Sequence, residues 1–191
     1  MSILEVVDLY KTFPAKGWSS AGRKKTSVIK GISFDMAEGE ILGILGPNGA
    51  GKTTTLQMLL GILTPTSGSV RIFGQDIATH QSEILEKVNF SSTYVDLPWR
   101  LSVRENLTWS SWLYQIPDRP RRLLQIRDLF RLEKLWDKTI TSLSAGQRTR
   151  VNLARSMINY PKLLLLDEPT ASLDPEVAKY IREFFADQRA R

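Results

Sequence analysis

The stretch ILGILGPNGAGKTTTLQMLL, from Ile41 to Leu60, indicates the fold around which the chain is built. Within it, Gly46 to Thr53 matches the pattern GxxxxGKT, which is typical of a loop that binds phosphate groups. The apolar run Ile41 to Leu45 predicts a buried strand before the loop, and Thr54 to Leu60 predicts a helix after it. We therefore expect a strand, a phosphate loop and a helix in that order.

Each residue type in the loop has a physical role in holding phosphate. Gly46, Gly49 and Gly51 can adopt backbone angles closed to other residues and let N–H groups point into one cavity. The helix that begins near Lys52 adds further N–H groups and the positive end of its dipole. Lys52 is expected to reach the β- and γ-phosphates, and the Thr53 hydroxyl is expected to bind Mg²⁺. The candidate nucleotide contacts of this segment are Gly46, Asn48, Gly49, Ala50, Gly51, Lys52, Thr53 and Thr54.

The composition is that of one ordinary globular domain, with 191 residues, 42% of them hydrophobic and 24% charged. No apolar run approaches the roughly 20 residues that cross a bilayer, and the amino terminus lacks the features of a signal peptide. We therefore expect a chain that is neither secreted nor membrane-spanning. Cysteine is absent and His80 is the single histidine, which excludes disulfides and histidine metal clusters. The net charge of +6 is compatible with nucleic acid or an anionic membrane, although a modest excess usually serves solubility.

The amino-terminal part predicts two half-buried strands, Ile3 to Leu9 and Val28 to Met36, from their alternating apolar residues. Between them, Lys16 to Lys30 is basic and lacks acidic residues, which indicates an exposed loop. The alternative is contact with lipid head groups or a partner. Farther along, we expect strands at Ser69 to Phe73 and Val88 to Phe90, and a helix at Ser82 to Lys87.

The middle of the chain predicts helices. Ser102 to Glu105 has the capping-box pattern SxxE and opens a helix toward Gln115, and Asp118 to Leu132 predicts an amphipathic helix. Four of the five tryptophans fall between Trp99 and Trp136. We expect them to pack a small helical lobe, and the alternative is an aromatic docking surface for another protein.

Two further patterns follow. Ser144 to Gln147 is a second capping box ahead of a helix through Met157. The apolar run Leu163 to Leu166 ends in Asp167 and Glu168, as expected of a buried strand with two acids at the ligand edge of an α/β sheet. Asp174 and Pro175 then cap and start the last helix.

Three ordered motifs carry a resemblance. With LSAGQ at Leu143 to Gln147, LLLLDEP at Leu163 to Pro169 and SLD at Ser172 to Asp174, the chain resembles the ATP-binding cassette (ABC) family, the motor domains of ABC transporters. The resemblance implies an α/β fold: a RecA-like P-loop NTPase core with an N-terminal antiparallel β lobe and an inserted α-helical lobe. It implies a single domain, in which residues 1–90 form the β lobe and phosphate-loop core, 91–157 the helical lobe, and 158–191 the return to the core.

The resemblance also assigns roles to residues. Asp167 would hold the Mg²⁺ shell, and Glu168 would orient or deprotonate the attacking water, whereas the alternative is that both acids only cap a loop. The signature residues Ser144, Ala145, Gly146 and Gln147 would contact the ATP of a second subunit, so that two MgATP are enclosed in a head-to-tail dimer. Asp174 would support that interface, and Phe13 would lie under the adenine.

The sequence departs from the family pattern at three places. Ala145 replaces the commoner second glycine of the signature, and Ser92 or Thr93 stands where the family usually has a glutamine. The family also has one more strand after the last helix, ending in a histidine, whereas this chain ends at Arg191. We therefore expect a C-terminally truncated domain that binds MgATP but hydrolyses it poorly.

The function that the resemblance implies is the ATPase subunit of an ABC transporter, leaning to export. Its partners would be a separate membrane-spanning subunit and a second nucleotide-binding domain, in a homodimer or heterodimer, with no nucleic acid expected. It would lie at the cytoplasmic face of the membrane. The alternatives are a soluble ABC-type ATPase that acts on ribosomes or nucleic acid, and a regulatory subunit that binds nucleotide without hydrolysing it.

Overall fold

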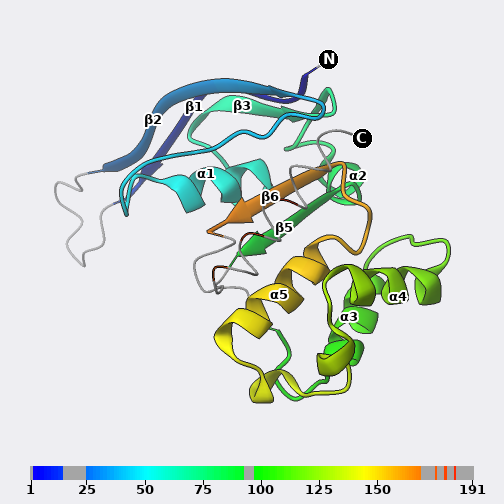
Figure 1. The fold of residues 1–191 in the computed structure, drawn as a ribbon. Coiled ribbons are helices and arrows are strands. Elements are labelled where there is room, and N and C mark those ends of the chain that lie inside the picture. Colours follow the sequence, from blue (N-terminus) through cyan, green and yellow to red (C-terminus); the bar gives the residue numbers. More distant parts are fainter. Residues whose placement is uncertain are drawn as a thin grey trace. The chain divides into compact units, whose positions relative to one another are not determined.

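The computed structural model describes residues 2–14, 25–92 and 97–168, together with Pro175, Lys179 and Glu183. The described residues form two compact units, a first unit within Met1–Ile84 and a second unit within Leu85–Asp187. The elements of each unit are labelled in Figure 1.

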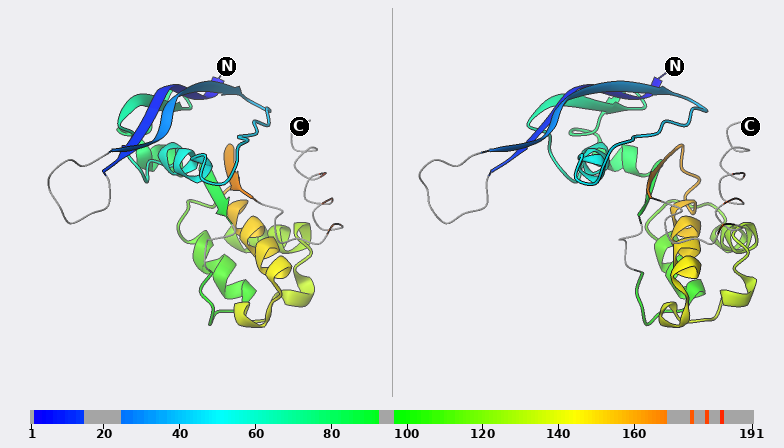
Figure 2. Two further views of the ribbon diagram at one scale, coloured as in Figure 1. Left: turned by 90° about the vertical axis from the view of Figure 1, so that its left-hand side faces the viewer. Right: turned by 60° about the vertical axis from the view of Figure 1, so that its left-hand side comes forward.

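The first unit is an antiparallel sheet with a helix against one face. Its strands have the order β2-β1-β3-β4, with bounds β1 Ser2–Phe13, β2 Thr26–Ala37, β3 Ser67–Ile72 and β4 Gln75–Asp76. Helix α1, Lys52–Leu59, lies beneath this sheet in each view (Figures 1 and 2) and buries Leu56, Met58 and Leu59. The short helix α2 spans Gln81–Leu85. The antiparallel β lobe that the sequence predicted is therefore present.

A β-bulge in β1 keeps its apolar residues on one face. Leu4 and Val6 are buried, as alternation requires, but Leu9 is also fully buried three positions later. The register of β1 against β2 shifts between Val6 and Leu9, and Asp8 has a φ of 45°. A bulge adds one residue to the strand and so shifts the alternation of inward and outward side chains by one position. Leu9 therefore faces the core, as Leu4 and Val6 do.

The strand predicted at Ile41 to Leu45 is wrong for this structure. Residues 40–47 have no strand conformation, although the turn and helix that follow them form. Ile41 is 62% exposed, Leu42 39% and Leu45 94%. A strand requires hydrogen-bonded neighbours, and an apolar parallel strand also requires cover on both faces. No strand pairs with this run in the described part of the chain.

The second unit combines a parallel strand pair with a small helical bundle. Strands β5, Val88–Ser92, and β6, Leu163–Asp167, pair in parallel. The helices are α3 Val103–Ser111, α4 Arg119–Leu129 and α5 Ala145–Ser156, with 3₁₀ turns at Glu133–Leu135 and Ile140–Ser142. Their shared core includes Leu107, Ile126, Phe130, Leu132, Val151, Leu153 and Ile158. Helix α5 lies alongside α3 in Figure 1, as the sequence pattern of a helical lobe predicted.

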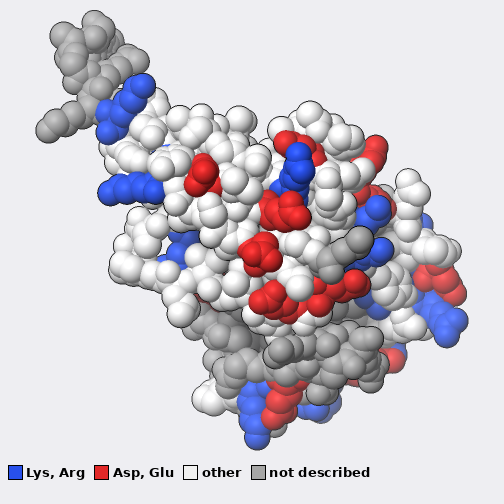
Figure 3. All heavy atoms as spheres, turned by 90° about the horizontal axis from the view of Figure 1, so that it is seen from above, with Lys and Arg blue, Asp and Glu red and all other residues white. Residues whose placement is uncertain are grey.

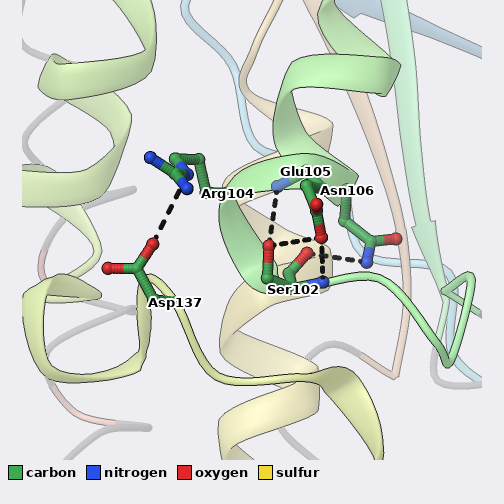
Figure 4. Close-up of polar contacts among 5 residues, drawn as sticks. All are labelled: Ser102, Arg104, Glu105, Asn106 and Asp137. Atoms are coloured by element: carbon green, nitrogen blue, oxygen red, sulfur yellow. Dashed lines mark hydrogen bonds and ion pairs between the residues drawn. The ribbon is translucent and has the colours of Figure 1, made fainter.

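Helix α3 begins at the predicted capping box (Figure 4). The Glu105 main-chain N–H donates to the Ser102 Oγ at 3.2 Å, and the Ser102 N–H donates to the Glu105 carboxylate at 2.8 Å. The Asn106 side chain donates to the Ser102 carbonyl at 3.0 Å. These main-chain and hydroxyl hydrogen bonds from Ser102 lower the pKa of Glu105 below its ordinary value. An Arg104–Asp137 ion pair at 3.4 Å ties the helix to the segment after α4.

Three of the four tryptophans between Trp99 and Trp136 do not pack into the helical lobe as expected. Trp136 packs against the helical core, as expected. Trp99, Trp109 and Trp112 instead lie largely exposed, at 59%, 45% and 65%. Trp109 lies on the solvent side of α3, whose buried side includes Leu107 and Ser110, and Trp112 follows the end of this helix. Packing of the lobe therefore explains only Trp136.

The predicted domain boundaries stay a prediction, and the predicted last helix is described at three residues only. Strand β5 belongs to the second unit, whereas the sequence analysis assigned residues 1–90 to the β lobe and phosphate-loop core. The predicted division of the chain remains a proposal. Pro175, Lys179 and Glu183 are helical, and Lys179 forms an ion pair with Glu183 at 3.7 Å, one turn away. Asp174 and Thr93 lie outside the described residues.

Candidate functional site

The phosphate loop lies in the first unit and leads directly into α1. Gly51 is the N-cap of this helix, with a φ of 92°, and Gly49 has a φ of 81°. The Ala50 N–H donates to the Pro47 carbonyl at 3.1 Å and closes a turn over the loop. Gly46, Asn48, Gly49, Ala50 and Thr53 are exposed, and Thr54 is half-buried. The loop thus presents its main chain and the first N–H groups of a helix to solvent, which is the arrangement that binds anions.

Strand β2 fixes the base of this loop. A Cβ on Gly51 would lie 2.4 Å from the Ile29 Cδ1 and 3.2 Å from the Val28 Cγ1. Gly51 is buried, and the Thr55 hydroxyl donates to its carbonyl at 3.0 Å. The sequence predicted Val28 and Ile29 only as strand residues. In the structure, their side chains also limit how closely the sheet can approach the phosphate loop.

Lys52 folds back over its own loop. Its Nζ donates to the Gly46 carbonyl at 2.8 Å and to the Pro47 carbonyl at 3.1 Å. The ammonium therefore bridges two carbonyls of the phosphate loop itself. Phosphate oxygens are stronger acceptors for an ammonium than neutral carbonyls, so a bound phosphate would compete for the same protons.

Phe13 lies at the end of β1, opposite Thr26 of β2, and is half-buried. The Lys11 Nζ lies 5.1 Å from the centre of its ring, so one face of the ring already meets a cation. Phe13 and the loop are connected through β2, whose Val28 and Ile29 contact Gly51. Its role under an adenine ring stays a prediction.

The two predicted acids lie at the carboxyl end of β6, in the second unit. Asp167 is the last strand residue and only 5% exposed, whereas Glu168 is exposed. Glu168 has a φ of 51°, an uncommon conformation for a residue with a side chain. Such backbone strain is often found at functional sites.

Ser92 lies beside Asp167 in the sheet. The parallel register pairs Ser92, the last residue of β5, with Asp167, the last residue of β6. Ser92 is 5% exposed. Ser92, one of the two positions where the family pattern predicts a glutamine, is therefore adjacent to the candidate metal ligand and carries a hydroxyl side chain.

The signature segment forms the amino-terminal end of α5. Ser144 is the N-cap, and its Oγ accepts from the Gln147 N–H at 3.2 Å while the Gln147 side chain accepts from the Ser144 N–H at 3.1 Å. The predicted capping box is confirmed. Ser144 and Ala145 are exposed, and Gly146 and Gln147 are half-buried. The opposite end of α5 meets β5, where the Asn89 side chain donates to Asn159 at 2.8 Å. The structure therefore places Ser144 at the end of α5 that points away from β5.

The donors suit magnesium by their chemistry. Mg²⁺ prefers oxygen ligands and typically takes one or two from protein, with phosphate and water completing the shell. The Thr53 hydroxyl, exposed on the first turn of α1, and the Asp167 carboxylate at a strand end are oxygens of this kind. No group of three or more His, Cys, Asp or Glu side chains is placed to hold a metal within the described ranges.

A family model for ABC transporters matches residues 29–171, which include the phosphate loop, the signature and both acids. The chain belongs to the ABC transporter family. The predicted recognition and the P-loop NTPase fold class are thereby confirmed.

Curated ABC relatives agree with this assignment. The chain is 38% identical over 167 residues to the Nod factor export ATP-binding protein I of Paraburkholderia xenovorans (strain LB400), an alignment covering 86% of this chain and 55% of the relative. It is 34% identical over 184 residues to the bacitracin transport ATP-binding protein BcrA of Bacillus licheniformis, covering 95% of this chain and 56% of the relative. This ABC chain thus spans about half the length of the curated relatives it matches.

Solved ABC structures share the fold. The dimeric post-hydrolysis state of the ATP-binding cassette MJ0796, bound to ADP and Pi, matches with a TM-score of 0.85 and 25% identity, over 97% of this chain and 82% of that chain. The cbiO1 protein of Clostridium perfringens, part of the ABC transporter complex cbiONQ, matches with a TM-score of 0.77 and 28% identity, over 99% and 74%. Within the part of this ABC chain that the structure describes, every helix falls short of the length or apolar character that a membrane crossing requires.

Proposed function

We propose that this chain is the ATP-binding and hydrolysing motor subunit of an ABC transporter, which dimerises around two MgATP at the cytoplasmic face of a membrane. The observation that carries the proposal is the phosphate loop itself. Gly51 caps α1 in a left-handed conformation, and the Lys52 ammonium lies over the Gly46 and Pro47 carbonyls. Loop N–H groups, a helix amino terminus and an ammonium together form a cradle for a triphosphate.

The chemistry of hydrolysis follows from the acids of the second unit. Bound Mg²⁺ would neutralise charge on the β- and γ-phosphates, with Thr53 and Asp167 as its protein ligands. Glu168, which is exposed and directly follows β6, would accept a proton from the attacking water. Lys52 would stabilise the negative charge on the transferred phosphoryl group. The 191 residues are expected to bind MgATP and to hydrolyse it slowly.

Dimerisation would complete the nucleotide site. The exposed Ser144 caps α5 and the half-buried Gly146 lies in its first turn, where the main-chain N–H groups have no carbonyl partner inside the helix. Such an end attracts an anion, and we propose that it meets the γ-phosphate held by a second copy or a related cassette. The dimeric form of the similar cassette MJ0796 supports this arrangement. Contacts made only in the closed dimer would let ATP binding favour closure, and Asp174 is proposed to support that interface.

The transport role is supported by the relatives. Two similar proteins are named for Nod factor export and bacitracin transport, and cbiO1 belongs to a transporter complex. We therefore propose a separate membrane-spanning partner and a direction of export. The expectation that nucleic acid is not a partner stays a prediction; acidic side chains lie across the middle of the one face shown in Figure 3. A phosphate backbone is repelled by such a surface.

A regulatory binder that does not hydrolyse ATP is the second candidate. Ser92 lies opposite Asp167, where the family pattern leads us to expect a glutamine nearby. Comparing ATP turnover of the parent with that of Glu168→Gln distinguishes the two, since a catalytic carboxylate makes turnover fall by at least 100-fold on an order-of-magnitude basis. Equal turnover in the two chains would support the regulatory candidate.

Titration calorimetry with MgATP tests nucleotide binding. The parent should bind MgATP, and Lys52→Ala should lose at least about tenfold in affinity because the ammonium contacts the phosphates. Lys30→Ala is the matched control, since Lys30 is an exposed lysine of the same unit outside the loop. Absence of MgATP uptake by the parent, or equal affinity in the Lys52→Ala variant, would contradict the proposal.

A further inference from the structure

A side chain from α4 holds the carboxyl-terminal end of α5. The Arg122 Nε donates to the Ile158 carbonyl at 3.1 Å, and its Nη2 donates to the Met157 carbonyl. These two carbonyls directly follow α5, which ends at Ser156. Arg122 is only 7% exposed although it carries a charge. The last carbonyls of a helix have no partner inside it and form the negative end of its dipole, so a buried guanidinium satisfies both requirements.

The aromatic ring of Tyr160 packs against the Arg122 guanidinium. The Arg122 Cζ lies 3.5 Å from the centre of the Tyr160 ring, and the Tyr160 hydroxyl donates to the Gln125 side chain of α4 at 3.1 Å. Tyr160 has a φ of 52°, which is rare for a bulky residue. The left-handed turn brings the ring back over α4. We name Arg122, Gln125 and Tyr160 the α4–α5 clamp.

Burying the charged Arg122 guanidinium costs free energy of desolvation. An apolar side chain that only filled the same space would avoid this cost. Burial lowers the pKa of Arg122, and the neighbouring Tyr160 side chain opposes that shift. In the described part of the chain, its partners are main-chain carbonyls and an aromatic ring rather than a carboxylate. A methionine of similar length could fill the same space without desolvating a charge. The guanidinium instead fixes the distance and direction between α4 and the end of α5 through a planar, two-donor contact.

The far end of α5 is the signature. Ser144 caps that end, and the 12 residues of α5 separate it from the carbonyls that Arg122 holds. A helix of this length is about 18 Å long, so a tilt of roughly 3° at the clamp moves the serine end by about 1 Å. A displacement of about 1 Å in a group that contacts a reacting phosphate can reduce a rate on the order of 100-fold.

We infer that Arg122 is a positioning residue that sets where the Ser144 end of α5 meets the nucleotide of a second subunit. The inference rests on the proposed function, because the exact place of that end matters only if it contacts ATP across a dimer. Arg122 itself lies at the other end of the helix and contacts no nucleotide. Its loss should therefore weaken ATP-dependent dimerisation without changing how the phosphate loop binds ATP.

The test separates these two properties in a Glu168→Gln background, where bound ATP persists. Sedimentation velocity with MgATP should show dimerisation at least tenfold weaker for Arg122→Met, while calorimetry at protein concentrations below dimerisation should show MgATP affinity within twofold of the parent. Arg122→Lys should recover part of the dimerisation, because an ammonium reaches the same carbonyls but lacks the planar stack. Arg121→Met is the matched control, an exposed arginine one position away, and should behave as the parent.

A second variant keeps the test decisive if Arg122→Met does not fold. Tyr160 is 54% exposed, so Tyr160→Ala should fold and should weaken dimerisation several-fold by releasing the guanidinium. Parent-like dimerisation in the folded Arg122→Met or Tyr160→Ala chain overturns the inference, even if the unfolding free energy has fallen. A parent that does not bind MgATP, or binds it and stays monomeric, overturns the proposed dimer together with this inference.

Discussion

Gly51 shows what a single residue contributes at the base of the phosphate loop. Its φ of 92° lies in the region that favours glycine, and an added Cβ would lie 2.4 Å from the Ile29 Cδ1. We predict that Gly51→Ala lowers the free energy of unfolding by about 1–3 kcal/mol, through backbone strain and overpacking against a buried side chain. Urea unfolding of the variant and the parent measures this difference.

Gly43 provides the matched control for this substitution. A Cβ on Gly43 meets no atom within 4 Å, and its φ is not in the positive region. Gly43→Ala should therefore change the free energy of unfolding by less than about 0.5 kcal/mol. Equal effects of the two substitutions would show that the contact with Ile29 does not restrict the loop.

The two capping boxes have the same hydrogen-bond pattern, but a charged side chain closes one and a neutral side chain closes the other. Glu105 closes the box at α3, whereas the neutral Gln147 closes the one at α5. A carboxylate normally strengthens such a cap because it complements the helix dipole. At α5 it would also repel a phosphate approaching the same N–H groups. Gln147→Glu should therefore leave the fold at least as stable in urea but weaken MgATP-dependent dimerisation by about tenfold. Dimerisation equal to the parent would contradict a phosphate contact at this end.

Acid should weaken the α3 cap specifically. The Ser102 hydrogen bonds lower the pKa of Glu105 in the folded state relative to its ordinary value of 4.5. The stabilisation they provide is therefore complete above that ordinary value and is lost as pH falls through the lower, folded pKa. Glu105→Gln should destabilise the chain near pH 7 and make a smaller difference at a pH below 4.5, measured by urea unfolding. Gln147→Ala is the control: an amide does not titrate, so its effect should be similar at both pH values.

At the scale of the whole molecule, the exposed apolar run before the phosphate loop has a measurable consequence. Leu45 is 94% exposed, and Ile41 is 62% exposed. We predict that the 191-residue chain binds a hydrophobic dye, and that Leu45→Ser reduces the dye signal while changing the free energy of unfolding by less than about 0.5 kcal/mol. A loss of more than about 2 kcal/mol would instead mean that Leu45 is buried in solution, as the predicted strand required.

The sequence alone was sufficient where the cause is local. Both capping boxes, helices α1, α3, α4 and α5, and the acids at the end of β6 follow from side chains within a few residues of one another. The order of three motifs also indicated the family, which the comparisons confirmed. Capping hydrogen bonds join residues that are close in the sequence, and hydrophobic periodicity is a property of the sequence itself. Both can therefore be predicted without knowledge of the fold.

Tertiary structure alone decided the features that depend on distant partners. An apolar run is a strand only when other strands pair with it, so Ile41 to Leu45 could not be settled by its own composition. Likewise, the register that places Ser92 beside Asp167, the contact of Ile29 with Gly51 and the burial of Arg122 against Tyr160 join residues far apart in the chain. Arg122 falls four residues before the buried Ile126, on the same side of α4, which was the one sequence signal for its burial. Whether a buried arginine meets carbonyls or a ring depends on what the other helices bring to it.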